Sequence, residues 1–199
     1  KSAFDLIARR EKRGKDVFYK AKNNEFTKTL KSLQIVDSLR DPNAKVDRMW
    51  ELLVELVLFL RTMKHRTPIE ILKSFIKVSG VGQAPISPRE AAELRKVFRF
   101  LVSAYRNKKL RSTRLVKNQI HFYTMSTAII ADGLLNKLSE HALIAKLVSL
   151  GRIVDETILP PDKVKRSAKL YRELSAKHTT HPGRRADRQA EFLKIIKGL

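Results

Sequence analysis

The sequence predicts an all-α protein, a compact bundle of eight to nine helices, on three observations. Apolar residues recur at the spacing of an amphipathic helix in nearly every segment, and the alternation typical of strands is nearly absent. Two capping boxes that contain proline, at Thr67–Glu70 and Ser87–Glu90, mark helix starts. A hydrophobic fraction of 43% over 199 residues is sufficient for one packed core.

In the first half of the chain, helices are expected over residues 2–13, 16–39, 44–63 and 67–78. Asp41-Pro42-Asn43 marks a turn before the third of them. That helix is apolar around much of its circumference, so we expect it to be the central helix of the core. Gly80-Val81-Gly82 is interpreted as a link between helices, because the motif of a phosphate-binding loop is absent.

In the second half, a helix is expected from residue 87 to about 107, and residues 107–112 form a loop or a helix junction. One helix then covers 113–137, and another runs from the Ser139 cap to a stop at Gly151. After Pro160-Pro161 come a helix to about residue 177, a loop over 178–183 and a last helix over 184–199. Its apolar side is expected to carry Ala190, Phe192, Leu193 and Ile196. The proline break divides the chain into a core domain, 1–159, and a C-terminal helical pair, 160–199.

Several classes of protein are excluded by composition. The chain has no cysteine, which removes disulfide scaffolds, cysteine zinc sites, iron–sulfur clusters and thiol catalysis. Its longest strongly apolar stretch, Leu52–Leu60, is far shorter than the roughly 20 residues of a membrane helix. No signal peptide is visible, and the chain starts at Lys1, so we expect a cytoplasmic domain excised from a longer protein.

The charge of the chain points to a polyanionic partner. Its 42 basic and 20 acidic residues give a net charge of +22. No acidic residue occurs between Glu93 and Asp132, and a second basic zone covers residues 163–188. A solvated basic face and a membrane surface are the alternatives, but exposed surfaces normally mix charge signs and few apolar residues accompany the first cluster. Nucleic acid, DNA or RNA, single- or double-stranded, is therefore the leading partner class.

The candidate contacts lie in these two zones. Arg184, Arg185 and Arg188 fall at the start of the last helix, where positive side chains oppose the helix dipole and a bound phosphate would relieve the conflict. The residues that we expect to bind nucleic acid are Arg95, Arg99, Arg106, Lys108, Lys109, Arg111, Arg114, Lys117, Arg184, Arg185 and Arg188.

No catalytic residue, metal or cofactor is assigned from the sequence. His178 and His181 lie three residues apart, but no third ligand stands near them. His121 lies beside an apolar face and is interpreted as a packed or surface histidine. Motifs for stacking RNA bases are absent, and a helix-turn-helix around residues 137–140 or 160–162 lacks diagnostic turn residues.

One segment resembles a known family. Residues 48–60, RMWELLVELVLFL, resemble part of the helical region that follows the ParB/sulfiredoxin-like nucleotidase domain in bacterial GmrSD-like restriction and phage-defence proteins. Lys73–Ile76 follows at a similar gap, Phe18-Tyr19 and Asn24–Phe26 are similar to the tract before that run, and Arg184 with Phe192–Ile196 is similar to the closing helix. The catalytic Asp-Gly-Gln-Gln-Arg motif of the family is not present in this chain, so no catalytic residue is carried over.

The resemblance implies a helical accessory part of a nucleic-acid enzyme. Together with the charge, it favours a non-enzymatic domain that binds the nucleic-acid backbone within a larger nucleic-acid-processing protein or complex. Two alternatives stay open: an assembly module that binds an acidic protein, and a fragment of a restriction-type nuclease.

Overall fold

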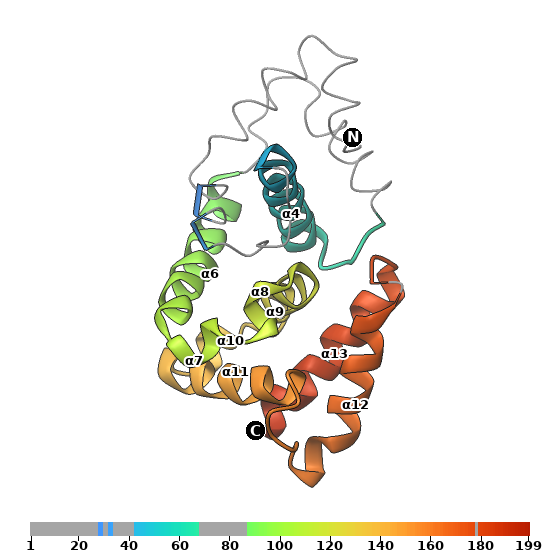
Figure 1. Cartoon of the computed structure of the whole chain (residues 1–199). Coiled ribbons are helices and arrows are strands. Elements are labelled where there is room, and N and C mark those ends of the chain that lie inside the picture. Colours follow the sequence, from blue (N-terminus) through green and yellow to red (C-terminus); the bar gives the residue numbers. More distant parts are fainter. Residues whose placement is uncertain (1–27, 30–31, 34–41, 68–86, 178) are drawn as a thin grey trace. The chain divides into compact units, whose positions relative to one another are not determined.

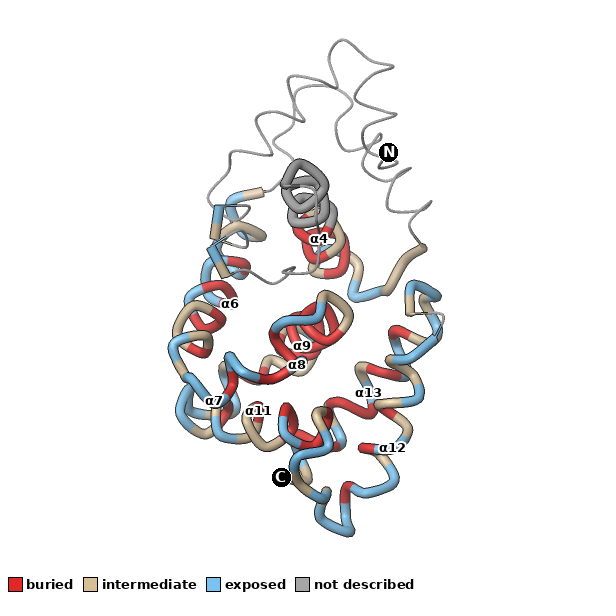
Figure 2. The backbone as a smooth tube through the Cα atoms, viewed as in Figure 1, coloured by how far each residue is buried: buried red, intermediate tan, exposed pale blue. Residues whose placement is uncertain are grey.

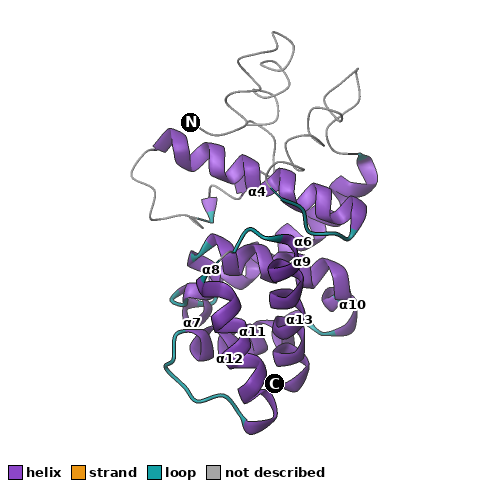
Figure 3. Cartoon of the chain, turned by 90° about the vertical axis from the view of Figure 1, so that its right-hand side faces the viewer, coloured by secondary structure: helices purple, strands orange, loops and turns teal. Residues whose placement is uncertain are grey.

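The computed structural model describes residues 28–29, 32–33, 42–67, 87–177 and 179–199 (Figure 1). All regular secondary structure within them is α-helical, which confirms the predicted fold class (Figure 3). The helices predicted over 2–39 and 67–78, the box at Thr67–Glu70 and the Gly80-Val81-Gly82 link lie wholly or largely outside the described residues. The described helices are α4 (Pro42–Thr62), α6 (Pro88–Arg106), α7 (Lys108–Arg111), α8 (Arg114–Lys117), α9 (Gln119–Asp132), α10 (Leu134–Lys137), α11 (Glu140–Val154), α12 (Asp162–Ala176) and α13 (Pro182–Gly198).

The chain divides into two compact units, Lys1–Phe98 and Arg99–Leu199, and α6 runs across the division. The boundary predicted after residue 159 lies within the second of these units. There α12 and α13 pack against each other, α13 also packs on α9, and both contact α11.

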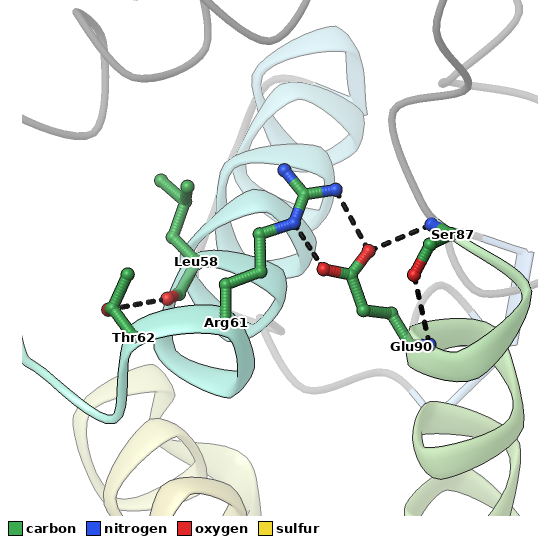
Figure 4. Close-up of polar contacts among 5 residues, drawn as sticks. All are labelled: Leu58, Arg61, Thr62, Ser87 and Glu90. Carbon is green, nitrogen blue, oxygen red and sulfur yellow. Dashed lines mark hydrogen bonds and ion pairs between the residues drawn. The ribbon is translucent and has the colours of Figure 1, made fainter.

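In the first unit, α4 confirms the long helix predicted over 44–63. Its buried apolar residues are Leu52, Leu53, Leu56, Val57, Leu58 and Phe59. The helix ends where Met63 takes a left-handed conformation with φ 51°. The Thr62 hydroxyl donates to the Leu58 carbonyl at 2.8 Å, which satisfies a carbonyl near the end of the helix (Figure 4).

The start of α6 has the capping box that the sequence predicts. The Ser87 N–H donates to Glu90 Oε2 at 2.8 Å, and the Glu90 N–H donates to Ser87 Oγ at 3.3 Å (Figure 4). Arg61 of α4 adds a two-pronged ion pair to the same carboxylate. Partial burial of the Glu90 carboxyl favours its neutral form, but the Arg61 and Ser87 contacts outweigh this and lower its pKa.

The second unit is built around α9. Its residues His121–Ile129 are all buried, and α8, α10 and α13 pack on it (Figure 2). Asp132, the last residue of α9, binds Lys137 of α10 at 3.1 Å and Lys197 of α13 at 2.9 Å. These two ion pairs join the end of α9 to both neighbouring helices.

The single helix predicted over 113–137 is wrong, because the chain breaks twice within it. Asn118 is extended (φ −95°, ψ 127°), and its side chain accepts a hydrogen bond from the Ile120 N–H at 2.8 Å, so it caps α9. Gly133 takes a left-handed conformation with φ 58° and ends α9. The result is one long helix, α9, between the single-turn helices α8 and α10.

Gly151 does not end a helix, as the sequence suggested, but lies inside α11. The helix continues to Val154, and Gly151 is buried against Thr113. A Cβ atom at Gly151 would lie 2.7 Å from Thr113 Oγ1 and 2.8 Å from its Cγ2, well inside van der Waals contact. The absence of a side chain at Gly151 therefore lets α11 approach the turn before α8.

We expect Gly151→Ala to lower the free energy of unfolding by about 1–3 kcal/mol, because the added methyl overpacks the contact with Thr113. Chemical denaturation measures this loss. Thr113→Ala in the same chain should restore part of it, since it removes Oγ1 and Cγ2, the two nearest of the three clashing atoms, and leaves Cβ at 2.9 Å. Gly183→Ala in α13 is the control, because its Cβ would meet no atom closer than 3.4 Å. An equal loss at both glycines would contradict the packing role of Gly151.

Candidate nucleic-acid interface

Three of the predicted arginines form one stripe on α6. Arg95, Arg99 and Arg106 are all exposed, and their spacing of four and seven residues places them on the same side of the helix. Leu94 and Leu101 lie on the opposite side and are fully buried. The burial of the apolar side therefore directs the three guanidinium groups outward.

The turn after α6 presents three more cations. Asn107 Oδ1 accepts hydrogen bonds from the backbone N–H groups of Lys109 and Leu110, at 3.0 and 3.1 Å, and so caps the single-turn helix α7. Leu110 is fully buried and anchors this turn to the core. Lys108, Lys109 and Arg111 are exposed around that anchor.

The next turn, α8, is fixed to α11 through Asp155. Its carboxylate accepts the Arg114 N–H, at 3.1 Å to Oδ1 and 3.3 Å to Oδ2. The Arg114 side chain stays 75% exposed. Leu115 and Val116 are buried, so α8 turns an apolar side inward and leaves Arg114 and Lys117 in solvent.

These elements bring together seven exposed cations of the second unit, which we call the basic corner. The helix breaks at Asn107 and again at Ser112-Thr113, so these cations come from three successive helices instead of one. No acidic residue occurs in the chain between Glu93 and Asp132. The basic corner consists of Arg99, Arg106, Lys108, Lys109, Arg111, Arg114 and Lys117.

The second predicted cluster is not a surface site, and this corrects the sequence prediction. Arg188 is 1% exposed and Arg185 is 6% exposed. The Arg185 guanidinium lies over the Tyr123 ring, 4.6 Å from its centre. Arg184 is half-buried and donates to the Glu173 carbonyl at 3.1 Å. Arg185 and Arg188 are therefore removed from the set of candidate contacts.

These arginines are buried because they lie on the side of α13 that packs into the core, which differs from the apolar side that the sequence predicted. Ala190, predicted to be in the core, is exposed, and Leu193 is half-buried. The spacing of Arg185 and Arg188 from Phe192 places both on its side of the helix, a signal that the sequence already contains. The buried side of α13 consists of Arg185, Arg188, Glu191, Phe192, Ile195 and Ile196.

Arg188 joins three parts of the second unit. Its Nε donates to Thr124 Oγ1 of α9 at 2.7 Å. Its Nη groups donate to the carbonyls of Leu174 in α12 and Thr179 at 3.4 Å. Burial is the main cause that lowers the pKa of Arg188, to about 10, so it keeps its charge at pH 7. These donors are used inside the protein, which leaves Arg188 a structural role.

His121 lies in the same buried region. Its Nδ1 atom and the Tyr171 hydroxyl are hydrogen-bonded at 2.9 Å. Burial first, and then the charges of Arg188 and Arg114, lower the pKa of His121 to about 4. The imidazole is therefore neutral at pH 7. His121 is 7% exposed, so of the two interpretations, a packed or a surface histidine, the structure shows the packed one.

The described residues offer no group of three or more His, Asp or Glu side chains that could hold a metal ion. His181 is exposed, and His178 lies outside the described part. Among the helices that the structure describes, none has both the length and the apolar character needed to cross a bilayer.

We expect stability to fall by up to about 3 kcal/mol as the pH drops from 6.5 to about 4, because of His121. The unfolded chain binds a proton at this residue below pH 6.5, whereas the folded chain resists it until about pH 4. In His121→Gln this part of the pH dependence should disappear from urea denaturation curves. His141→Gln, at an exposed histidine, should keep it; equal pH dependence in both variants would contradict the assignment.

No family model, curated protein or solved structure matches this chain.

Proposed function

We propose that this chain binds the phosphate backbone of a nucleic acid through the basic corner. The observation that carries the proposal is the exposure of seven cations on three successive helices in a stretch without acidic residues. Ordinary protein surfaces intersperse both charge signs, because a field of one sign costs self-repulsion. A polyanion that neutralises the field compensates for this cost, and releases counterions when it binds.

The chemistry of the corner favours contacts with phosphates. Four of its seven cations are arginines, whose planar guanidinium groups form paired hydrogen bonds with phosphate oxygens. Phosphate contacts position a protein on a nucleic acid but carry no sequence information by themselves. We therefore expect weak sequence preference, as for an accessory domain whose partner domain or subunit carries the specificity or the reaction. The resemblance to the GmrSD-like helical region supports this same role beside a nucleic-acid enzyme.

The surface favours a duplex over a single strand. Proteins that bind single strands stack the bases on exposed aromatic rings. Where the structure describes side chains, every Phe and Tyr is buried or half-buried, and the exposed large apolar residues are Met63 and Leu159. A duplex also offers two phosphates where a single strand offers one. Within the described residues, charge without exposed aromatic rings therefore matches double-stranded nucleic acid.

The first test measures salt dependence. Affinity for a short mixed-sequence duplex should fall steeply between about 50 and 200 mM salt. Neutralising three corner cations, Lys108→Gln/Lys109→Gln/Arg111→Gln, should weaken binding and make the slope of log K against log salt shallower by about 2.7, at about 0.9 per lost phosphate contact. Circular dichroism checks that the variant is folded.

The control removes the same charge elsewhere in the second unit, with Arg152→Gln/Lys163→Gln/Lys177→Gln, all at exposed cations. Equal losses in the two triple variants would show that only net charge matters. Affinity that does not change with salt would overturn the proposal. Binding to an acidic protein that persists after nuclease treatment, with no binding to a duplex, would favour the assembly module.

A second test compares strand forms. At equal length and salt, the duplex should bind at least about tenfold more tightly than either of its separated strands, because of its higher charge density. Competition titrations against a labelled duplex measure the ratio. Equal affinity for the single strand would contradict the duplex preference while leaving backbone binding intact.

A further inference from the structure

The end of α11 connects the basic corner to a second basic surface. Two neighbouring carboxylates follow this helix, and they contact cations of different helices. Asp155 binds the backbone of Arg114 in α8, and the Arg114 Nε lies 3.8 Å from its Oδ1. Glu156 binds Arg172 of α12, with 3.2 Å between Oε1 and Nη1. Because Asp155 and Glu156 are consecutive, Arg114 and Arg172 lie on either side of one turn.

Arg172 belongs to a row of cations along α12. Lys165, Lys169 and Arg172 are spaced by four and three residues, which places them on one side of the helix over about 10 Å. We call these three residues the α12 stripe. Lys165 and Lys169 are exposed, and Arg172 is half-buried against Glu156.

The α12 stripe is separate from the other cations of the same helix. Val164, Ala168 and Tyr171 form its buried side. Lys163 and Arg166 are exposed as well, but they lie about a third of a turn of the helix away from the stripe. Asp162 and Glu173, the exposed acids of α12, lie on the arc between the two sets. The cations of the α12 stripe are therefore the ones that continue the basic surface from α8. Lys163 and Arg166 lie on another side of α12 and serve as the comparison set.

We propose that a nucleic acid bound at the basic corner continues over the turn after α11 and onto the α12 stripe. This inference rests on the proposed function and extends its footprint to a helix that the acid-free part of the sequence does not include. The side chains that would meet phosphates beyond the corner are Lys165, Lys169 and Arg172.

Glu156 has a specific part in this arrangement. Its side chain is 72% exposed and forms an ion pair with Arg172, and it directly follows Asp155, which holds Arg114. A phosphate on this path approaches the Glu156 carboxylate and competes with it for the Arg172 guanidinium. Glu156 therefore opposes binding, and its removal strengthens the contact between the nucleic acid and the stripe.

The experiment compares three variants with the wild-type chain on the same labelled duplex, at several salt concentrations. Lys165→Gln/Lys169→Gln should weaken binding about five- to tenfold at about 50 mM salt and make the salt slope shallower by about 1.8, at about 0.9 for each lost contact. Lys163→Gln/Arg166→Gln removes the same charge from the same helix and should change the affinity less than about twofold. Glu156→Gln should tighten binding about threefold, since it removes a nearby like charge.

The outcomes separate this inference from the proposed function. If the wild-type chain shows no salt-dependent binding, the proposed function fails. If the basic-corner variant weakens binding while the two α12 double variants behave alike, the nucleic acid does not reach the stripe and only the inference fails. Tighter binding by Glu156→Gln supports the path over the turn and cannot arise from loss of folding, whereas unchanged or weaker binding overturns it.

Discussion

The second unit depends on one constraint. Nine consecutive residues of α9 are buried, and several of them are polar. Three of these polar groups are satisfied inside the protein. The Thr124 and Thr127 hydroxyls donate to carbonyls one turn earlier in the helix, and His121 is bonded to Tyr171. The Thr124 hydroxyl oxygen also accepts a hydrogen bond from the Arg188 guanidinium, and this bond links α13 to α9. Because unpaired buried polar groups cost about 1–3 kcal/mol each, the helices packed on α9 must supply Tyr171 and Arg188 as polar partners along with apolar side chains.

The basic corner follows from the same packing. Single-turn helices are not stable alone, so α7 and α8 exist because Leu110, Leu115 and Val116 are buried beside the larger helices. Apart from Thr113, which is buried, the positions between these anchors are exposed, and lysines and arginines occupy most of them. The close approach of Gly151 to Thr113 and the contact of Asp155 with Arg114 fix the turn from the α11 side. The geometry of the charged surface is therefore set by a few buried atoms beneath it.

Much of this arrangement is visible in the sequence, because it depends on local rules. Helical periodicity predicts the fold class, and the Ser87 and Ser139 caps predict the starts of α6 and α11. The exposure of the acid-free cluster is also predicted, since no apolar stripe includes its cations. The spacing of Arg188 from Phe192 puts it on the buried side of α13, but local rules do not identify the groups that accept its hydrogen bonds, because these come from α9, α12 and the segment after α12. The close contact at Gly151 depends on Thr113, far away in sequence, so the residue resembles an ordinary helix stop.

The bond between Arg188 and Thr124 joins residues that lie 64 positions apart, and this separation affects how the unit is made. During synthesis, α9 leaves the ribosome well before α13. Until α13 follows, the side of α9 that will bind Arg188 and Phe192 has no cover from it. Long-range closure of this kind slows folding and prolongs the exposure of apolar surface. The newly made second unit thus passes through an interval in which the cations of the basic corner are already present while its core is still open.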